Sequence, residues 1–329
     1  MIYTDPQAAA PAFAARIAQA QRILLLTHIN PDGDAIGSLL GAAHMLYALG
    51  KTPISLLASP APSYSLGLPG AEWLRVYQRG ELLPEVDLIW MLDTAAPDRV
   101  GLIAEEHAEA FTARPLLIVD HHVTNDGLGE LNLIDPTAAS TADLLFRLLR
   151  ALQWPITPDA ATCLYMGLIA DTQSFQTSST RPQTLHTAAE ILLAGADRRA
   201  VVTAIYFSLP ATTLRLTGLV LSELHQEEGL VWAHVTQAQL AASGAGDEAT
   251  DYVVSQLQRT TGMQICALFK ERHDGTVKLS LRSQPGINVA AIAQRWGGGG
   301  HAQAAGATLA LDLRGAEALI IPLLRQLLT

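Results

Sequence analysis

The fold is decided by the stretch Thr27-His28-Ile29-Asn30-Pro31-Asp32-Gly33-Asp34-Ala35-Ile36-Gly37-Ser38. An apolar run at 22–26 precedes it and predicts a buried strand, and a run at 35–49 follows it and predicts a helix. The stretch is therefore expected to be a loop between a strand and a helix. Sheets of the α/β class bind their ligands at such loops, beyond the carboxyl ends of the strands.

The loop carries three side chains of the kinds that bind metal ions, those of His28, Asp32 and Asp34. An imidazole with two carboxylates suits Mg²⁺ or Mn²⁺, and suits Zn²⁺ or Fe²⁺ less well. Pro31 and Gly33 favour a tight turn that directs the two aspartates at one centre. The alternative is an ordinary turn in which an aspartate caps the following helix. Residues elsewhere in the chain favour the metal centre.

Composition indicates a folded protein with a large core. The chain has 329 residues, of which 49% are hydrophobic and 16% charged, so its length allows two domains. It has no apolar run long enough to span a membrane, and its first residues lack a basic region, so we expect a cytoplasmic protein. Two distant cysteines, Cys163 and Cys266, make a structural disulfide improbable. The net charge of −10 argues against binding long nucleic acid.

Strands alternate with helices in the first part of the chain, which predicts a parallel α/β sheet. Three of the predicted strands are followed by side chains that can bind a metal ion: His28, Asp93, and the triplet Asp120-His121-His122. Because the carboxyl ends of parallel strands meet at one edge of a sheet, these side chains are expected to lie close together. Further strands are expected at 53–58 and 131–134.

The last third of the chain predicts a smaller, separate α/β unit. Its expected strands and helices lie at 230–235, 251–259, 265–269, 277–281, 288–296, 308–311 and 317–328. Residues 183–226 show helical periodicity and are interpreted as connecting helices. The predicted division is a domain at 1–190, connecting helices at 191–226 and a domain at 227–329.

Five further acidic and histidine positions are candidates for the centre. Asp93 is a candidate carboxylate shared by two cations. Neighbouring side chains on extended backbone point to opposite sides, so His121 and His122 cannot share one role unless the loop bends. One of them is expected to bind metal and the other to contact substrate. Asp120 is expected to orient a ring nitrogen. Asp171 ends an apolar helix, where a buried carboxylate needs a partner such as a metal ion.

The run Gly297-Gly298-Gly299-Gly300 with His301 is a candidate phosphate site. Backbone N–H groups without side chains can approach an anion closely, although flexible linkers show the same composition. Arg282 follows the predicted strand at 277–281 and can form a bidentate pair with a phosphate. Lys278 and Ser280 share its face, and the simpler interpretation of that face is a solvated one.

These motifs, in this order, resemble the DHH phosphoesterases, and within them the NrnA-like group that joins a DHH domain to a DHH-associated domain. The resemblance covers most of the chain and rests on His28 to Ser38, Asp93-Thr94, Asp120-His121-His122, Gly167 to Thr172, Arg282-Ser283 and Gly297 to Gly306.

The resemblance implies two Mn²⁺ ions, for which Mg²⁺ or Co²⁺ can substitute. One ion would be held by His28, Asp32 and Asp93. The other would be held by Asp34, Asp93, His121 and Asp171. His122 would contact the scissile phosphate, with Asp120 behind it. The substrate's other phosphate or terminal nucleotide would be held across the interdomain cleft by Arg282, Ser283, Gly298, Gly299, Gly300 and His301.

The implied activity is hydrolysis of short oligoribonucleotides (nanoRNA and dinucleotides) to mononucleotides, by a hydroxide that two metal ions activate. Removal of phosphate from 3′-phosphoadenosine 5′-phosphate is a second implied activity, and a homodimer is the implied assembly. The alternative within the family is turnover of cyclic di-adenylate or a linear dinucleotide as a second messenger. A non-catalytic nucleotide-binding protein is the alternative outside it, and the full ligand set argues against that class.

Overall fold

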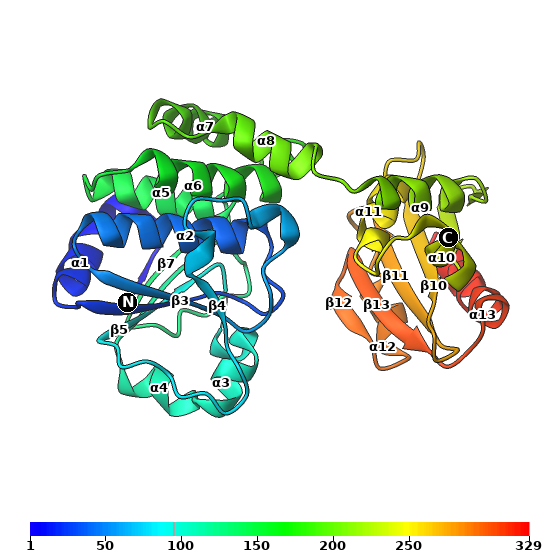
Figure 1. The fold of residues 1–329 in the computed structure, drawn as a ribbon, viewed down its shortest axis with the longest axis horizontal. Helices are drawn as coiled ribbons and strands as arrows, with labels where there is room; N and C mark the ends of the chain where they lie inside the picture. Colours follow the sequence, from blue (N-terminus) through cyan, green and yellow to red (C-terminus); the bar gives the residue numbers. More distant parts are fainter. Residues whose placement is uncertain (95, 329) are drawn as a thin grey trace. The chain divides into compact units, whose positions relative to one another are not determined.

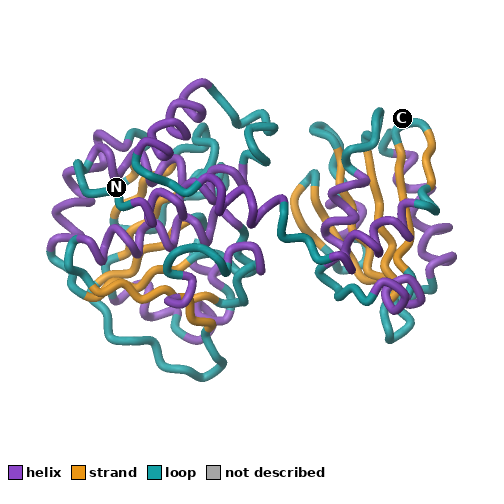
Figure 2. The backbone as a smooth tube through the Cα atoms, turned by 45° about the horizontal axis from the view of Figure 1, so that its top comes forward, coloured by secondary structure: helices purple, strands orange, loops and turns teal. Residues whose placement is uncertain are grey.

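The structure is a computed structural model that describes residues 1–94 and 96–328, with the backbone alone at His301. The described residues form two compact units, which divide after Ser208. Each unit is a sheet with helices on its faces (Figures 1 and 2). The fold class predicted from the sequence is confirmed. The predicted domain limits at 190 and 226 stay predictions.

The first unit is built on a sheet whose seven described strands all run parallel. Their order across the sheet is β1-β7-β6-β5-β2-β3-β4. The strands in chain order are β1 (Ile2–Tyr3), β2 (Arg22–Leu26), β3 (Thr52–Leu57), β4 (Leu74–Val76), β5 (Leu88–Leu92), β6 (Leu116–Asp120) and β7 (Leu131–Ile134). The residues of β5 and β6 are all buried, as expected for parallel strands covered on both faces.

Helices cover both faces of this sheet (Figure 1). Successive residues of β2 alternate between two apolar clusters, with Leu25 in one and Leu26 in the other. The cluster of Leu25 includes α1 (Pro6–Ala18), α2 (Gly33–Ala48), α5 (Thr141–Ala151) and α6 (Pro158–Asp171). The cluster of Leu26 includes η3 (Pro97–Val100), α3 (Leu102–Glu106) and α4 (Ala108–Ala113). Outside α5 and α6 lie α7 (Pro182–Leu193) and α8 (Arg198–Tyr206). Two short 3₁₀ turns, η1 (Ser63–Ser65) and η2 (Ala71–Trp73), lie between β3 and β4.

Glycines bring α2 and α6 into direct backbone contact. A Cβ atom on Gly37 would lie 2.4 Å from the carbonyl oxygen of Cys163. A Cβ atom on Gly167 would lie 2.6 Å from Oδ1 of Asp34. No side chain fits at either point, so these glycines set the spacing of the two helices. Asp34 on α2 and Asp171 at the end of α6 are thereby held at a fixed separation.

The second unit has a mixed sheet of six described strands in the order β12-β13-β11-β10-β9-β8. The strands are β8 (His225–Glu227), β9 (Leu230–Val235), β10 (Ile265–Glu271), β11 (Val277–Ser283), β12 (Gly299–His301) and β13 (Ala304–Leu309). One face packs on α9 (Ala211–Leu221), α10 (Gln237–Ser243) and α11 (Ala249–Leu257). The other packs on α12 (Ala290–Gln294) and α13 (Leu313–Gln326).

Two predicted elements near the C-terminus have different bounds in the structure. The last strand was expected at 308–311, but β13 spans Ala304–Leu309 because it pairs with β11 and β12. Part of the glycine run that is a candidate phosphate site belongs to the strand β12. The last helix was expected from 317 but begins at Leu313, because Asp312 caps it by accepting the N–H of Gly315.

Among the described residues, no single helix is long and apolar enough to cross a membrane. The bent pair of α8 and α9 meets that test together, by length and composition alone.

Candidate active site

The candidate site lies where the strand order of the first sheet reverses. From β2 the chain proceeds to β3 on one side, whereas β5, β6 and β7 follow on the other side. Crevices at such switch points are where open α/β sheets bind ligands. His28 comes two residues after β2, Asp93 directly after β5, and His121 directly after β6. The strand order thus brings side chains from distant parts of the sequence to one edge.

Three overlapping groups of side chains have donor atoms within 4.8 Å of one another. One group is His28, Asp32 and Asp93, and another is Asp34, His121 and Asp171. The third is Asp93, His121 and His122. All six predicted metal-binding residues therefore occur in these groups, and Asp93 is common to two of them. Whether they bind metal stays a prediction.

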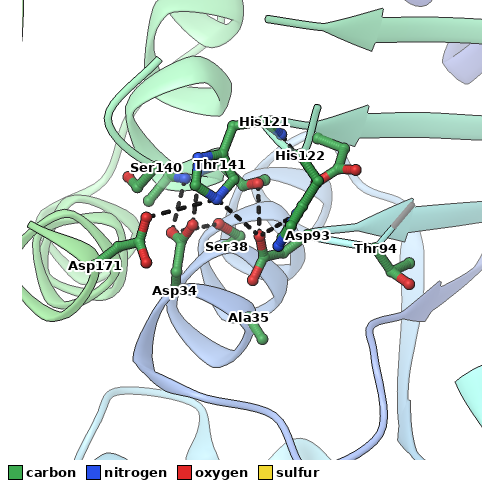
Figure 3. Close-up of polar contacts among 12 residues, drawn as sticks. Asp34, Ala35, Ser38, Asp93, Thr94, His121, His122, Ser140, Thr141 and Asp171 are labelled. Atoms are coloured by element: carbon green, nitrogen blue, oxygen red, sulfur yellow. Dashed lines mark hydrogen bonds and ion pairs between the residues drawn. The ribbon is translucent and has the colours of Figure 1, made fainter. Parts of the chain in front are cut away.

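Asp93 is the centre of the arrangement (Figure 3). Its Oδ2 lies 3.5 Å from Nε2 of His28, and its Oδ1 lies 3.7 Å from Nε2 of His121. Its backbone has a φ of 57°, in the left-handed region that a residue with a side chain adopts at a cost of about 1–3 kcal/mol. The chain therefore turns sharply at the end of β5. The residue at this turn, Asp93, is the one that the group of His28 and the group of His122 share.

The N-terminus of α5 holds two of these carboxylates in place. The backbone N–H of Thr141 donates to Oδ2 of Asp34 at 2.6 Å, and the N–H of Ala142 donates to Oδ1 at 2.9 Å. The Thr141 hydroxyl donates to Oδ1 of Asp93 at 2.9 Å. Free N–H groups at a helix start suit a carboxylate, so α5 orients both buried aspartates.

Asp32 combines the two roles that the sequence left open. Its Oδ1 accepts the N–H groups of Asp34 and Ala35 at 3.0 and 3.1 Å, which caps α2. The same residue is exposed and belongs to the group with His28 and Asp93. Capping orients the carboxylate without occupying its second oxygen.

Two histidines have defined ring orientations. Nδ1 of His28 faces the carbonyl oxygen of Ile29 at 2.9 Å, so it carries the proton and leaves Nε2 facing Asp93. Nδ1 of His122 lies 2.7 Å from Oδ1 of Asp120, a buried carboxylate. The hydrogen bond to Asp120 outweighs burial and raises the pKa of His122 to about 9. His122 is therefore a cation at neutral pH.

The loop bends after β6, so the rings of His121 and His122 do not point to opposite sides. Their centroids are 4.7 Å apart, and both rings lie near Asp93. The reason is that β6 ends at Asp120, whose side chain accepts the N–H of His121 at 2.9 Å and so turns the chain. The alternation of an extended strand no longer applies beyond that point.

The crowded carboxylates fit a divalent cation. Burial, followed by the charges of Asp93, Asp171 and Asp32, raises the pKa of Asp34 well above its usual value. Burial also raises the pKa of Asp171, to about 6. Among the described ion pairs, no lysine or arginine contacts these carboxylates, so bound cations are the counter-charge that the donor set calls for.

The carboxylate of Asp93 differs from its neighbours. Burial opposes its ionisation, but the hydrogen bond with His28 and the charges of His121 and His122 bring the pKa of Asp93 below its usual value. It therefore stays ionised where the surrounding acids are harder to ionise, which suits a ligand shared by two cations.

Comparison with known proteins identifies the family. Residues 22–168 match the model of the DHH family, N-terminal domain, and residues 234–324 match that of the DHHA1 domain. The chain is 36% identical over 310 residues to the bifunctional oligoribonuclease and PAP phosphatase NrnA of Thermus thermophilus, which covers 93% of this chain and 90% of that protein. The chain belongs to the DHH family. The resemblance inferred from the motifs is confirmed, and so is the enzyme class of a metal-dependent hydrolase.

The chain is also similar to a second kind of phosphodiesterase in sequence and to a solved structure in fold. It is 27% identical over 315 residues to the cyclic-di-AMP phosphodiesterase GdpP of Geobacillus thermodenitrificans, covering 89% of this chain and 45% of that longer protein. A solved structure of an exopolyphosphatase-related protein from Bacteroides fragilis superposes with a TM-score of 0.90 over 97% of this chain and 96% of that one. At 24% identity, that superposition shows the shared fold alone.

The DHHA1 residues predicted to bind substrate have different environments. Arg282 is half-buried, and its guanidinium donates to the carbonyl oxygen of Leu281 at 2.9 Å. Ser283 is buried and its hydroxyl donates to the carbonyl oxygen of Ile287 at 2.7 Å, so it holds the following loop. The side chain of His301 lies outside the described residues.

The glycines of this segment serve the close approach of β12 to β13. A Cβ atom on Gly298 would lie 2.2 Å from the carbonyl oxygen of Gly306, and one on Gly300 would lie 2.3 Å from that of Ala304. A Cβ atom on Gly299 would meet nothing within 4 Å. Gly298 and Gly300 are therefore required by backbone packing, whereas the space beside Gly299 is open.

Two residues of the DHH domain site were missed by sequence reasoning. Thr141 donates its hydroxyl to Oδ1 of Asp93 at 2.9 Å. Asn125 donates from Nδ2 to Oδ2 of Asp120 at 2.7 Å and so holds the carboxylate that orients His122. The sequence feature that could have indicated Asn125 is its position, five residues after Asp120 in the loop that follows Asp120-His121-His122.

We expect Thr141→Val to weaken metal binding by about tenfold or more, the usual cost of losing a group that orients a ligand. Valine keeps the shape and the backbone N–H bond to Asp34 but removes the hydroxyl that donates to Asp93. Titrating activity against Mn²⁺ concentration measures the effect, and saturating metal should restore most of the rate. Thr141→Ser is the matched control, and equal titration curves for both variants would contradict the role.

Proposed function

We propose that this DHH enzyme hydrolyses short oligoribonucleotides to mononucleotides and also acts as a phosphatase on 3′-phosphoadenosine 5′-phosphate. The observation that carries the proposal is a set of three overlapping donor groups, two of which share Asp93, in a chain that matches a bifunctional relative over 93% of its length. The donor set provides for metal-assisted phosphoester hydrolysis, and the relative indicates which phosphoesters.

The proposed cofactor is a pair of Mn²⁺ ions. His28, Asp32 and Asp93 would hold one ion, and Asp34, Asp93, His121 and Asp171 the other. Bound divalent cations lower the pKa of water and neutralise charge on phosphoryl oxygens, which is the chemistry that this reaction needs. Mixed imidazole and carboxylate donors suit Mn²⁺, with Mg²⁺ or Co²⁺ as substitutes.

His122 would contact the scissile phosphate, and Asp120 would hold the ring of His122 in place. The Nδ1 proton of His122 is committed to Asp120, so the ring is held with Nε2 available. As a cation at neutral pH, His122 can donate from Nε2 to a phosphoryl oxygen and stabilise the charge that develops there. Asp120, fixed by Asn125, keeps the ring in this orientation.

The DHHA1 unit would supply the remaining contacts to the substrate. Arg282 can form two parallel hydrogen bonds to a phosphate. Gly299 and Gly300 are proposed to approach the same ligand through their backbone N–H groups, and His301 is proposed to donate to it. The N–H of Gly298 donates to the carbonyl oxygen of Ala293 at 3.1 Å, so Gly298 would contribute only the absence of a side chain. Ser283 would support this site through its bond to the loop at Ile287. We also propose a cytoplasmic location and a homodimer.

The second candidate function is turnover of cyclic di-adenylate. The observation that favours it is the 27% identity to a cyclic-di-AMP phosphodiesterase over 89% of this chain. Both functions use the same metal donors, so they differ in which nucleotide the DHHA1 unit accepts.

Initial rates with Mn²⁺ on four substrates test the proposal. The substrates are an RNA dinucleotide, a long RNA, 3′-phosphoadenosine 5′-phosphate and cyclic di-adenylate, each repeated after chelation of the metal. We expect the dinucleotide to be hydrolysed fastest, the long RNA slowly, and none of them without metal. A clear preference for cyclic di-adenylate would replace the first function by the second, and turnover that survives chelation would overturn both.

A further inference from the structure

The open face of β11 carries a line of three polar side chains, Lys278, Ser280 and Arg282, which we call the β11 strip. Residues along β11 alternate, so the positions between these three are buried in the core on the other face. Lys278 is exposed, and Ser280 and Arg282 are half-buried. Arg282 is the proposed phosphate contact of the DHHA1 unit, so the strip extends from that contact along the strand.

The neighbouring strand leaves room beside this strip. In the register of β13, Thr308 lies opposite Lys278, Gly306 opposite Ser280, and Ala304 opposite Arg282. These are small residues, and none of the apolar clusters of the described residues contains a side chain from this face of β11 or β13. The strip therefore borders an open surface with two cations along it and small neighbours beside them.

The far end of the strip is a cavity with a buried lysine. Lys270 of β10 lies directly opposite Lys278, although like charges at directly opposed positions destabilise a sheet. Lys270 is only 5% exposed. The cavity has a volume of about 360 Å³ and is lined by Asp247, Glu248, Asp251, Lys270, Arg272 and Lys278.

An exposed carboxylate neutralises the buried lysine. Oδ1 of Asp247 lies 2.6 Å from Nζ of Lys270, and the Asp247 side chain is 84% exposed. Asp247 belongs to the segment between α10 and α11, whereas the cations belong to the strand side of the cavity. An exposed carboxylate from a connecting segment therefore pairs with a buried lysine of the sheet. An anionic ligand could take the place of this carboxylate.

We propose that the β11 strip and Lys270 form a path for the backbone of an oligonucleotide, with Lys278 and Lys270 binding a phosphate beyond the one at Arg282. This inference rests on the proposed function. Lys278 and Arg282 are four positions apart along the strand, or about 13 Å. A ligand anchored at Arg282 reaches Lys278 only if its chain continues by further nucleotides, so the path serves substrates longer than a dinucleotide.

The chemistry of the strip favours a phosphate backbone over a base. Cations and hydroxyls contact phosphates and sugars without reading sequence. The described strip has no aromatic side chain on which a base could stack. Asp247 competes for Lys270, so an incoming phosphate has to displace this carboxylate.

The test compares KM for an RNA dinucleotide and an RNA pentanucleotide, using the full chain with saturating Mn²⁺. Lys278→Gln should raise KM for the pentanucleotide about fivefold, the upper end for one exposed ion pair, with little change for the dinucleotide. Asp247→Asn should shift KM for the pentanucleotide in the opposite direction. The matched control is Arg314→Gln, which removes one exposed positive charge from α13 on the other face of the sheet.

The outcomes separate this inference from the proposed function. If the wild-type enzyme cleaves the dinucleotide, and Lys278→Gln and Arg314→Gln have the same KM for the pentanucleotide, the path is refuted and the function stands. If Lys278→Gln raises KM equally for both substrates, Lys278 is not a distal contact and the path is also refuted. If neither RNA is cleaved with metal present, the proposed function itself fails.

Discussion

Replacing Asp93 by asparagine should reduce kcat/KM by more than about 100-fold. Residues that merely orient a metal ligand cost 10–100-fold when lost, and Asp93 is a candidate ligand common to two donor groups. Asparagine keeps the size of the side chain but removes the negative charge that faces His28 and His121. The measurements are steady-state kinetics at saturating Mn²⁺ and the metal content per chain.

Metal content decides how the result for Asp93 is interpreted. We expect Asp93→Asn to bind less Mn²⁺ than the wild type at equal free metal. Asp159→Asn is the control, because it removes one exposed charge from the start of α6, the helix that carries Asp171, at a distance from the centre. Near-normal turnover by Asp93→Asn would end the assignment of a shared carboxylate.

The second large effect is expected for His122→Gln. This variant should have a kcat that is lower by about 10²–10³-fold, whereas its metal content per chain should not change. This is the usual cost of removing one group that stabilises developing charge in the transition state. Glutamine is neutral, whereas His122 is a cation at neutral pH because Asp120 raises its pKa. His186→Gln is the control, since His186 is an exposed histidine on α7.

A double mutant tests whether His122 and Asp120 act as a unit. Asp120→Asn alone should lower kcat by a smaller factor, because the ring loses its fixed orientation but remains present. Combined with His122→Gln, it should add little, since residues that act together are not additive. If His122→Gln instead releases metal, then His122 is a ligand, as its place in the group with Asp93 and His121 permits.

The convergence of donors could be predicted because it depends on a simple property of parallel sheets. Asp93 and His121 each follow an apolar run that the sequence identifies as a strand, and all such strands end at one edge. Local pattern therefore sufficed to place residues far apart in the chain near His28. The capping role of Asp32 was also foreseen as an alternative, and the structure combines it with the donor group.

What the sequence could not reveal depends on contacts between distant segments. The hydroxyl of Thr141 reaches Asp93 across 48 positions of sequence, and a threonine after a helix cap has no pattern of its own. The directions of His121 and His122 depend on a turn made by the side chain of Asp120. The strand at Gly299–His301 exists because β13 pairs with it.

The backbone contact between α2 and α6 has a consequence for ion size. Because the two helices already touch at glycines, no rearrangement of side chains can bring them closer, and Asp34 and Asp171 form a stiff pair of donors. Ca²⁺ takes six to eight oxygens at about 2.3–2.6 Å in flexible surroundings, whereas Mg²⁺ accepts ligands at about 2.0–2.1 Å. We expect such a stiff pair of carboxylates to discriminate between bound ions by radius and to favour the small divalent ions over calcium.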